Sequence, residues 1–164
     1  MKSVLNRRLA LMMAAGAALL PATRVAARVA ARGPDDRWAE GVFQLYRGLI
    51  NSHDFDLLER HVIAPDAVFV FSDRREEGIA AVRAGFERTW SILPDEVYEM
   101  TDPEWLIDGP DAAACAFRYS YSGTLADGRP LSGGGQGINL FRRAEGRWRL
   151  TFEQLTPDTR TAKA

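Results

Sequence analysis

Several polar side chains in this sequence fall on otherwise apolar strand-like faces, where they could bind a ligand. In the run AAACAFRYSY, Tyr119 and Tyr121 are two residues apart, so both hydroxyl groups should point to the same, inner face of a strand. Asn139 is polar among the apolar neighbours of INLF, and Trp105 lies in the strand-like run EWLID. Buried phenol and amide groups need hydrogen-bond partners, which a ligand can supply. We expect these four residues to line a small-molecule site, and the alternative for each is an ordinary core position.

The last strand-like run, RWRLTFEQL, offers one more polar candidate. Trp148, Leu150, Phe152 and Gln154 are spaced by two residues and should share a face. The first three are apolar, so that face is predicted to be the core. Gln154 would then point inward and use its amide to bind a ligand. The alternative is a residue at the rim, where the strand ends.

Residues suited to metal or nucleophilic chemistry are few. Cys115 is the single cysteine, and its apolar strand-like surroundings favour a small buried core residue over a reactive thiol. His53 and His61 are the only histidines and do not form a metal-binding spacing. We therefore expect no metal site.

The glycine-rich run SGGGQGINLF, residues 132–141, suggests a phosphate-binding loop at first sight. Such a loop needs a helix N-terminus aimed at the phosphate, and here the glycines lead into a strand. Ile138 also stands where the pattern G-x-G-x-x-G requires its third glycine. We expect no nucleotide cofactor, and interpret the glycines as a bend or a place of close packing.

The periodicity of the apolar residues predicts the elements that hold these side chains. Helices are expected at residues 36–52, 55–61 and 79–93, with a strand at 67–72 between the last two, and Asp54 should cap the second helix. About four long strands follow, the first of them broken at Asp102-Pro103. DRREEG and ADGR are predicted turns. Helices followed by antiparallel strands indicate an α+β fold.

The N-terminus is typical of an export signal. Lys2, Arg7 and Arg8 precede the apolar run LALMMAAGAALL, which is shorter than the roughly 20 residues of a membrane-spanning helix. We expect residues 1–34 to be a cleavable signal, and the domain to become periplasmic or secreted without stable membrane insertion. The paired arginines resemble a twin-arginine signal, which makes that export route one option. A mitochondrial transit peptide is the competing interpretation.

The charge of the chain is unevenly distributed around a formal net charge of −1. Residues 1–34 hold six basic side chains and no acid, so the rest, with 15 basic and 22 acidic residues, is negative by 7. Nucleic-acid binding needs clustered cations, and this balance argues against a nucleic-acid partner. We expect residues 35–158 to form one domain and residues 159–164 to be a flexible tail.

The segments HDFDLLERHVIAPDAVFVFS, GIAAVRAGF and GQGINLFRRAEGRWRLTFEQLTP resemble the SnoaL-like branch of the nuclear transport factor 2-like superfamily, which includes ketosteroid isomerases. The resemblance covers about residues 36–157. It implies a cone-shaped, curved mixed or antiparallel sheet packed against three N-terminal helices, a cystatin-like α+β roll around a pocket. Members of the family include isomerases, cyclases, dehydratases, and non-catalytic ligand-binding or association domains.

The resemblance to ketosteroid isomerases is incomplete at the catalytic positions. Tyr46 lies eight residues before Asp54 and retains the position of the tyrosine that donates to the oxyanion. The position of the general base falls on Phe71, so Asp73 is the nearest candidate base and would need a bulge or gap. The second oxyanion donor is missing, because residues 131–141 contain no carboxylate. A steroid isomerase is therefore not expected.

The sequence thus predicts an exported domain that binds a small apolar or aromatic molecule, with Tyr46 and Asp73 as catalytic candidates. Whether isomerase- or lyase-type chemistry accompanies binding is left open. The alternative function is a non-catalytic homodimeric interaction domain. In that case Arg118, Ser120 and Ser122 would lie on the outer, pairing face of the sheet.

Overall fold

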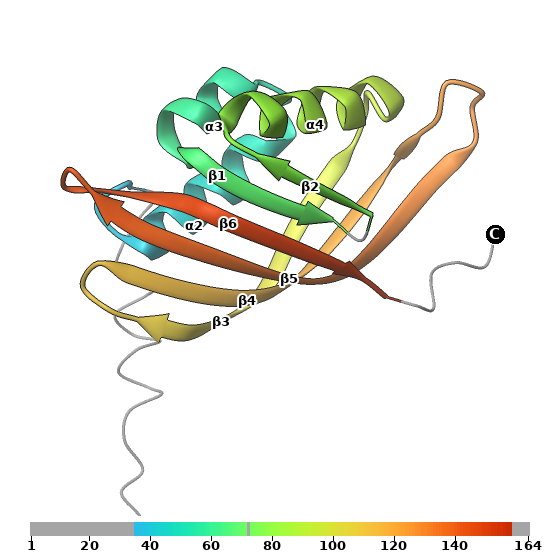
Figure 1. Cartoon of the computed structure of the whole chain (residues 1–164). Helices are drawn as coiled ribbons and strands as arrows, with labels where there is room; N and C mark the ends of the chain where they lie inside the picture. Colours follow the sequence, from blue (N-terminus) through green and yellow to red (C-terminus); the bar gives the residue numbers. More distant parts are fainter. Residues whose placement is uncertain (1–34, 72, 159–164) are drawn as a thin grey trace, which may run out of the picture. The chain divides into compact units, whose positions relative to one another are not determined.

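The computed structural model describes residues 35–71 and 73–158 (Figure 1). The predicted signal at 1–34 and the predicted tail at 159–164 lie outside the described residues. The elements, in chain order, are α2 (Ala39–Leu49), the 3-10 helix η1 (Ile50–Ser52), α3 (Phe55–His61), β1 (Ile63–Phe71), β2 (Arg74–Glu77), α4 (Ile79–Ile92), β3 (Val97–Asp108), β4 (Ala112–Thr124), β5 (Pro130–Ala144) and β6 (Arg147–Pro157).

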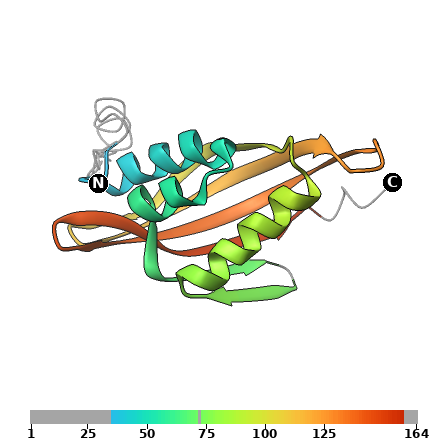
Figure 2. The same ribbon diagram turned by 90° about the horizontal axis from the view of Figure 1, so that it is seen from above.

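The six strands form one curled sheet in the order β2-β1-β6-β5-β4-β3. All neighbouring strands are antiparallel except β1 and β6, which are parallel. Helices α2, α3 and α4 lie on one face of this sheet (Figures 1 and 2). The predicted α+β class with three covering helices is confirmed. The run DRREEG, predicted as a turn, instead contains the edge strand β2, because it pairs with β1.

Local sequence signals set the helix boundaries. The side chain of Asp54 accepts hydrogen bonds from the backbone N–H groups of Asp56 and Leu57, at 3.0 and 3.4 Å, and so caps α3 as predicted. Helix α4 ends at Ile92, two residues before Pro94, whose ring disfavours helical backbone in the residue preceding it. Within the described residues, no helix is long and apolar enough to span a membrane.

Two irregularities in the strands change the direction of side chains. In β3, Asp102 has a positive φ of 51° and the pairing with β4 shifts between Thr101 and Glu104, so the predicted break is confirmed. In β6, the ladder pairs Phe152 with Leu140 but Leu150 with Phe141, which leaves Thr151 as an extra residue. A bulge of this kind inverts the inside-outside alternation for every residue beyond it.

The glycines of β5 make room for aromatic rings of β4. Gly133 pairs with Tyr121 and Gly137 pairs with Phe117 in the ladder. A Cβ atom on either glycine would overlap the ring of its partner. The interpretation of this run as a place of close packing is therefore confirmed, and the rings can lie flat along the inner face of the sheet.

One end of the inner sheet face is filled by aromatic side chains. The ring of Phe43 from α2 meets the rings of Trp105 and Phe117 edge-on, with centroids 6.2 and 5.7 Å apart. The centroid of the Phe141 ring lies 5.8 Å from that of Trp105, with the two rings tilted by 39°. We name these four residues the filled end.

Candidate functional site

The other end of the inner face encloses a cavity of about 310 Å³, which we name the hollow. Its volume is close to the lower limit of ~300–1,000 Å³ that is typical of small-molecule pockets. The hollow lies between the C-terminal part of α2, helix α4 and the concave face of the sheet. Its lining includes Tyr46, Ile50, Phe71, Asp73, Arg74, Gly85, Phe86, Thr89, Ile92, Leu93, Glu96, Tyr98, Tyr119, Tyr121, Leu131, Glu153, Leu155 and Pro157.

A buried carboxyl group, Glu153, is the most unusual member of this lining. Its side chain is 1% exposed, and the Tyr46 hydroxyl donates a hydrogen bond to its Oε1 atom at 3.2 Å. Burial raises the pKa of Glu153 to about 8, against the opposing effect of the Tyr46 hydrogen bond. The second oxygen, Oε2, has no hydrogen-bond partner among the described residues. At neutral pH this carboxyl group is mostly protonated.

The bulge at Thr151 is the reason that Glu153 points into the hollow. Trp148 and Leu150, before the bulge, are buried as predicted, but beyond it the buried residue is Glu153 and Gln154 is exposed. The expectation that Gln154 points inward is therefore wrong. Gln154 lies over a separate depression on the outer face of the sheet. The sequence did carry a signal for this outcome: Glu153 and Gln154 are consecutive in FEQ, so a register shift of one residue decides which of the two side chains faces inward.

Asn139 lies beside this carboxyl group on the inner face of the sheet but is not among the residues that line the hollow. It is fully buried and sits directly opposite Glu153 in the β5–β6 ladder. Its amide opposes the rise in the pKa of Glu153. Neither the amide oxygen nor the amide nitrogen reaches hydrogen-bond geometry with another described side chain. Asn139 can therefore influence the pKa of Glu153, but it does not line the hollow where a ligand would bind.

Phenol groups form much of the remaining polar surface. Tyr46, Tyr119 and Tyr121, predicted from the sequence, line the hollow together with Tyr98, which the sequence reasoning missed. The rings of Tyr98 and Tyr119 stack at 5.8 Å with an angle of 8°. Burial raises the pKa of Tyr46 and Tyr98 well above the usual value, so both stay neutral. The Tyr98 hydroxyl has no hydrogen-bond partner among the described residues.

A side chain from the helical layer fixes the backbone at Tyr98. The amide of Asn51, in η1, donates to the Tyr98 carbonyl at 2.9 Å and accepts from the Tyr98 N–H at 2.7 Å. Asn51 thus pairs with β3 as a neighbouring strand would. The alternation of Tyr98 with Met100 in EVYEM was the sequence signal for its inward direction.

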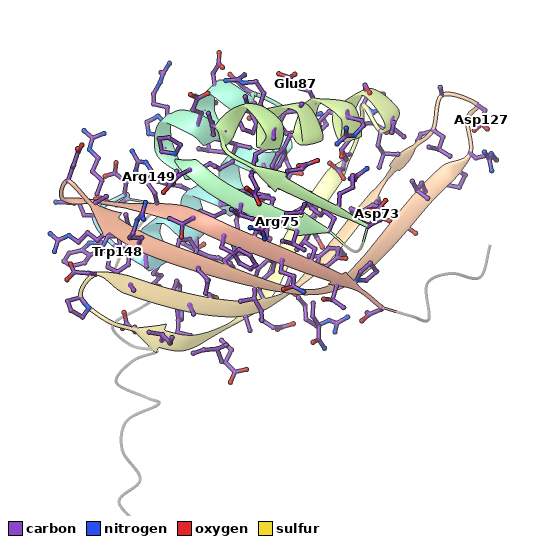
Figure 3. The ribbon with its side chains drawn as sticks, viewed as in Figure 1. Asp73, Arg75, Glu87, Asp127, Trp148 and Arg149 are labelled. Carbon is purple, nitrogen blue, oxygen red and sulfur yellow. The ribbon has the colours of Figure 1, made fainter. Side chains whose placement is uncertain are left out.

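Asp73, the predicted base, lies at the rim of the hollow rather than at its floor. Its side chain is 74% exposed, and the Arg74 guanidinium lies 3.9 Å from it. Figure 3 shows Asp73 where β1 connects to β2, at the end of the sheet remote from Trp148. The resemblance to ketosteroid isomerases pointed to Asp73, whereas the buried acid of the hollow is Glu153, on strand β6.

A second carboxyl group, Glu96, lines the hollow just before β3. Partial burial raises its pKa, while a hydrogen bond with Trp90 opposes the rise. The Trp90 ring is itself held by stacking with His53, at 5.0 Å. Glu96 and Glu153 both raise the pKa of Tyr46 and Tyr98, so both acids lie within electrostatic range of these two phenols.

Trp105 is not part of the hollow, although the sequence suggested it. It belongs to the filled end, because it lies near the other end of β3 from Tyr98, beyond the break at Asp102. Cys115 is buried, and burial raises the pKa of its thiol to about 12, which keeps it unreactive. No group of three His, Cys, Asp or Glu side chains suited to a metal ion occurs within the described residues.

The arrangement of Tyr46 and Glu153 has a definite chemical capacity. A neutral carboxylic acid beside a phenol can donate hydrogen bonds to an oxygen that gains negative charge. A carboxyl group that titrates near pH 8 can also take up or release a proton under physiological conditions. The surrounding aromatic and aliphatic side chains favour an apolar ligand body.

Comparison with solved structures shows the same fold. Over 75% of this chain and 92% of the other, the structure is similar to a nuclear transport factor 2-like superfamily protein from Salmonella enterica, with a TM-score of 0.64 and 14% identity. A protein with a cystatin-like fold from Caulobacter vibrioides is similar over 73% of this chain and 87% of its own, with a TM-score of 0.63 and 17% identity. The association domain of C. elegans CaMKII is similar over 70% of this chain and 90% of its own, with a TM-score of 0.55 and 21% identity.

A search of curated proteins gave no match. The family model of the SnoaL-like domain matches residues 42–151, which include α2 from its second turn, the whole of the helical layer beyond it, and the sheet as far as the bulge in β6. The family model therefore names the same family as the resemblance found in the sequence, and the observed fold is consistent with it. This chain belongs to the SnoaL-like domain family.

Proposed function

We propose that this protein binds a small, mainly apolar or aromatic molecule in the hollow, and that Tyr46 and Glu153 hold the polar group of that molecule. The observation that carries the proposal is the carboxyl group of Glu153. It is fully buried, accepts a hydrogen bond from Tyr46 at one oxygen, and has no hydrogen-bond partner among the described residues at the other. Buried polar atoms are nearly always hydrogen-bonded, so a free oxygen on the floor of an apolar cavity points to a ligand.

The same pair supports an isomerase- or lyase-type reaction in the hollow. Both reaction types move a proton next to a polarised oxygen, and the Tyr46 and Glu153 side chains supply a donor and a titratable acid there. In this proposal Glu153 takes the central place that the resemblance gave to Asp73. Exposure of Asp73 to solvent makes it a weaker candidate for moving a proton at the floor of the hollow.

A thermal-shift screen with neutral aromatic and alicyclic compounds tests binding. The wild-type domain should be stabilised by members of the panel, and Glu153→Gln should lose most of that stabilisation because the titratable acid is gone. Gln154→Ala is the matched control, since Gln154 is adjacent in the strand but faces the opposite side. Stabilisation of all three proteins to the same extent would contradict a role of Glu153, and a panel without any stabilising compound would contradict the proposal.

The second candidate function is homodimerisation through the outer face of the sheet. Ile138 and Leu140 are 42% and 39% exposed on this face, and Phe152 pairs with Leu140 in the ladder. Arg118 and Ser120, on the neighbouring strand, are exposed as the sequence predicted. An association domain is among the similar structures. Light scattering should give twice the monomer mass, and Ile138→Asp should give the monomer; a wild-type monomer would exclude this candidate.

We also propose that the domain acts after export, as a periplasmic or secreted protein. The support is the basic N-terminus followed by the apolar run of residues 9–20. Expression of the full chain in a bacterium, with fractionation and N-terminal sequencing, should give a periplasmic or extracellular product that begins near residue 35. A full-length product in the cytoplasm would contradict export.

A further inference from the structure

We propose that the ligand of the hollow is a protonated amine attached to an aromatic or apolar body. This inference rests on the proposed function, because it concerns the same cavity, and it specifies the chemical class of the bound molecule. Three independent features of the hollow support it: its charge balance, its unpartnered oxygens and its ring faces.

The charged side chains that line the hollow are predominantly acidic. Asp73, Glu96 and Glu153 are the acids, and Arg74 is the one basic residue among the described lining residues. The Arg74 guanidinium is held at the rim, 5.7 Å over the Phe71 ring and about 4 Å from Asp73. Neither Glu96 nor Glu153 forms an ion pair with a basic side chain in the part of the chain that the structure describes. Ionisation of a buried carboxyl group without a nearby cation is unfavourable, and a cationic ligand would favour the ionised form.

The unpartnered oxygens at the floor suit a donor-rich ligand group. Glu153 Oε2 and the Tyr98 hydroxyl are both buried without a hydrogen-bond partner among the described residues. An ammonium group carries three donors and no acceptor, whereas a carboxylate ligand would bring only acceptors. A carboxylate would also oppose ionisation of Glu96 and Glu153, whereas an ammonium group favours it. The floor therefore favours an amine over an acid.

The walls of the hollow are rich in aromatic rings. Tyr98 and Tyr119 stack face to face, and Phe71, Phe86 and Tyr121 also line the cavity. Ring faces attract cations through their quadrupoles, and sites that recognise ammonium groups commonly combine several rings with an acid. The chain beyond residue 34 is negative by 7, which also favours the approach of a cation.

Binding of an amine should be coupled to the proton on Glu153. The polar and charged groups around Glu153 are Tyr46 from α2, Tyr98 from β3, Asn139 from β5, Tyr119 from β4, and Glu96. The three phenols stay neutral because their pKa values are raised. An arriving ammonium group favours the ionised form of Glu153, so the carboxyl group should release its proton on binding. Below the pKa of about 8, amine affinity should rise with pH, by up to about tenfold per pH unit.

Isothermal titration calorimetry with three probes of one ring system tests the inference. Tryptamine, tryptophol and indoleacetate carry an amine, an alcohol and a carboxylate on the same indole body. At pH 7 the wild-type domain should bind tryptamine at least about tenfold more tightly than tryptophol, and indoleacetate least. Titrations in two buffers of different ionisation enthalpy should show release of close to one proton per tryptamine, and none for tryptophol. The affinity for tryptamine should rise from pH 6 to pH 8.

Two variants keep the test decisive. Glu153→Gln should lose both the preference for tryptamine over tryptophol and the proton release, and a cooperative unfolding transition should show that the variant is folded. Glu96→Gln should weaken tryptamine binding but keep the proton release. Equal binding of tryptamine and tryptophol without proton release, or preferred binding of indoleacetate, would overturn the amine class and leave a ligand-binding hollow. A domain that binds none of the probes, and no compound of the neutral panel, would overturn the proposed function as well.

Discussion

The filled end and the hollow share one sheet face but use their aromatic side chains in opposite ways. In the filled end, Phe43 meets the rings of Trp105 and Phe117 edge-on, Trp105 is tilted against Phe141, and none of these four residues lines the hollow. In the hollow, Tyr98 and Tyr119 stack on each other, and the space beside them stays open. The filled end holds carbon atoms only, apart from one indole nitrogen, whereas the hollow holds a buried acid.

The difference separates stability from function along the same strands. Close packing of rings stabilises the fold at one end. At the other end lie a buried acid and a phenol hydroxyl that has no hydrogen-bond partner among the described residues, and both lower stability unless a ligand binds to them. Substitutions at the two ends should therefore differ in kind as well as in size.

The largest expected effect is at the filled end. Phe43→Ala should lower the free energy of unfolding by about 3–5 kcal/mol, because it removes a fully buried ring that touches two others. Chemical denaturation measures the loss, and Phe43→Leu, which keeps most of the volume, is the control with a smaller loss. A loss below about 1 kcal/mol for the alanine variant would mean that this end is not close-packed.

The next effect is the pH dependence that the hollow imposes on stability. The raised pKa of Glu153 means that the folded state binds its proton more tightly than the unfolded state. Stability from this group is complete below pH 4.5 and is lost as the pH rises through about 8, so the free energy of unfolding should fall by up to about 1.4 kcal/mol for each pH unit in that range.

Glu153→Gln should flatten this decline, as measured by urea denaturation at a series of pH values. The raised pKa values of Glu76 and Glu96 act in the same direction, so a shallower slope should remain in the variant. The same steep slope in both proteins would show that Glu153 is not the buried acid responsible.

The smallest expected effect concerns the hydroxyl of Tyr46. Tyr46→Phe keeps the ring and removes the hydrogen bond to Glu153, at a cost of about 1 kcal/mol at neutral pH. Because that bond favours the ionised carboxylate, its removal should move the pKa of Glu153 further upward. The midpoint of the pH-dependent stability change reports the shift, and a downward movement would contradict the assigned hydrogen bond.

Local signals in the sequence predicted most of the fold. The Asp54 cap, the break at Asp102 and the close packing of the β5 glycines depend on residues near each other in the chain or on the size of a single side chain. The edge strand β2 was missed because its charged residues are strand residues only through pairing with β1. Pairing between distant segments is not visible in local composition.

The site was only partly predictable for the same reason. Tyr46, Tyr119 and Tyr121 were found because helical spacing and strand alternation are local patterns. Glu153 was missed because the extra residue at Thr151 is defined by the partner strand, and without the bulge the alternation selects Gln154. The extra residue Thr151 thus places the carboxyl group of Glu153 in the hollow instead of the amide of Gln154.

The protonation state of Glu153 tests the central claim most directly. Infrared difference spectroscopy, with Glu153→Gln as the reference, isolates the carbonyl band of this one protonated carboxyl group. The band should be present at pH 7 and disappear with a midpoint near pH 8, since burial raises the pKa of Glu153 to about 8. A carboxyl group that is already ionised at pH 6 would contradict a buried acid at the floor of the hollow.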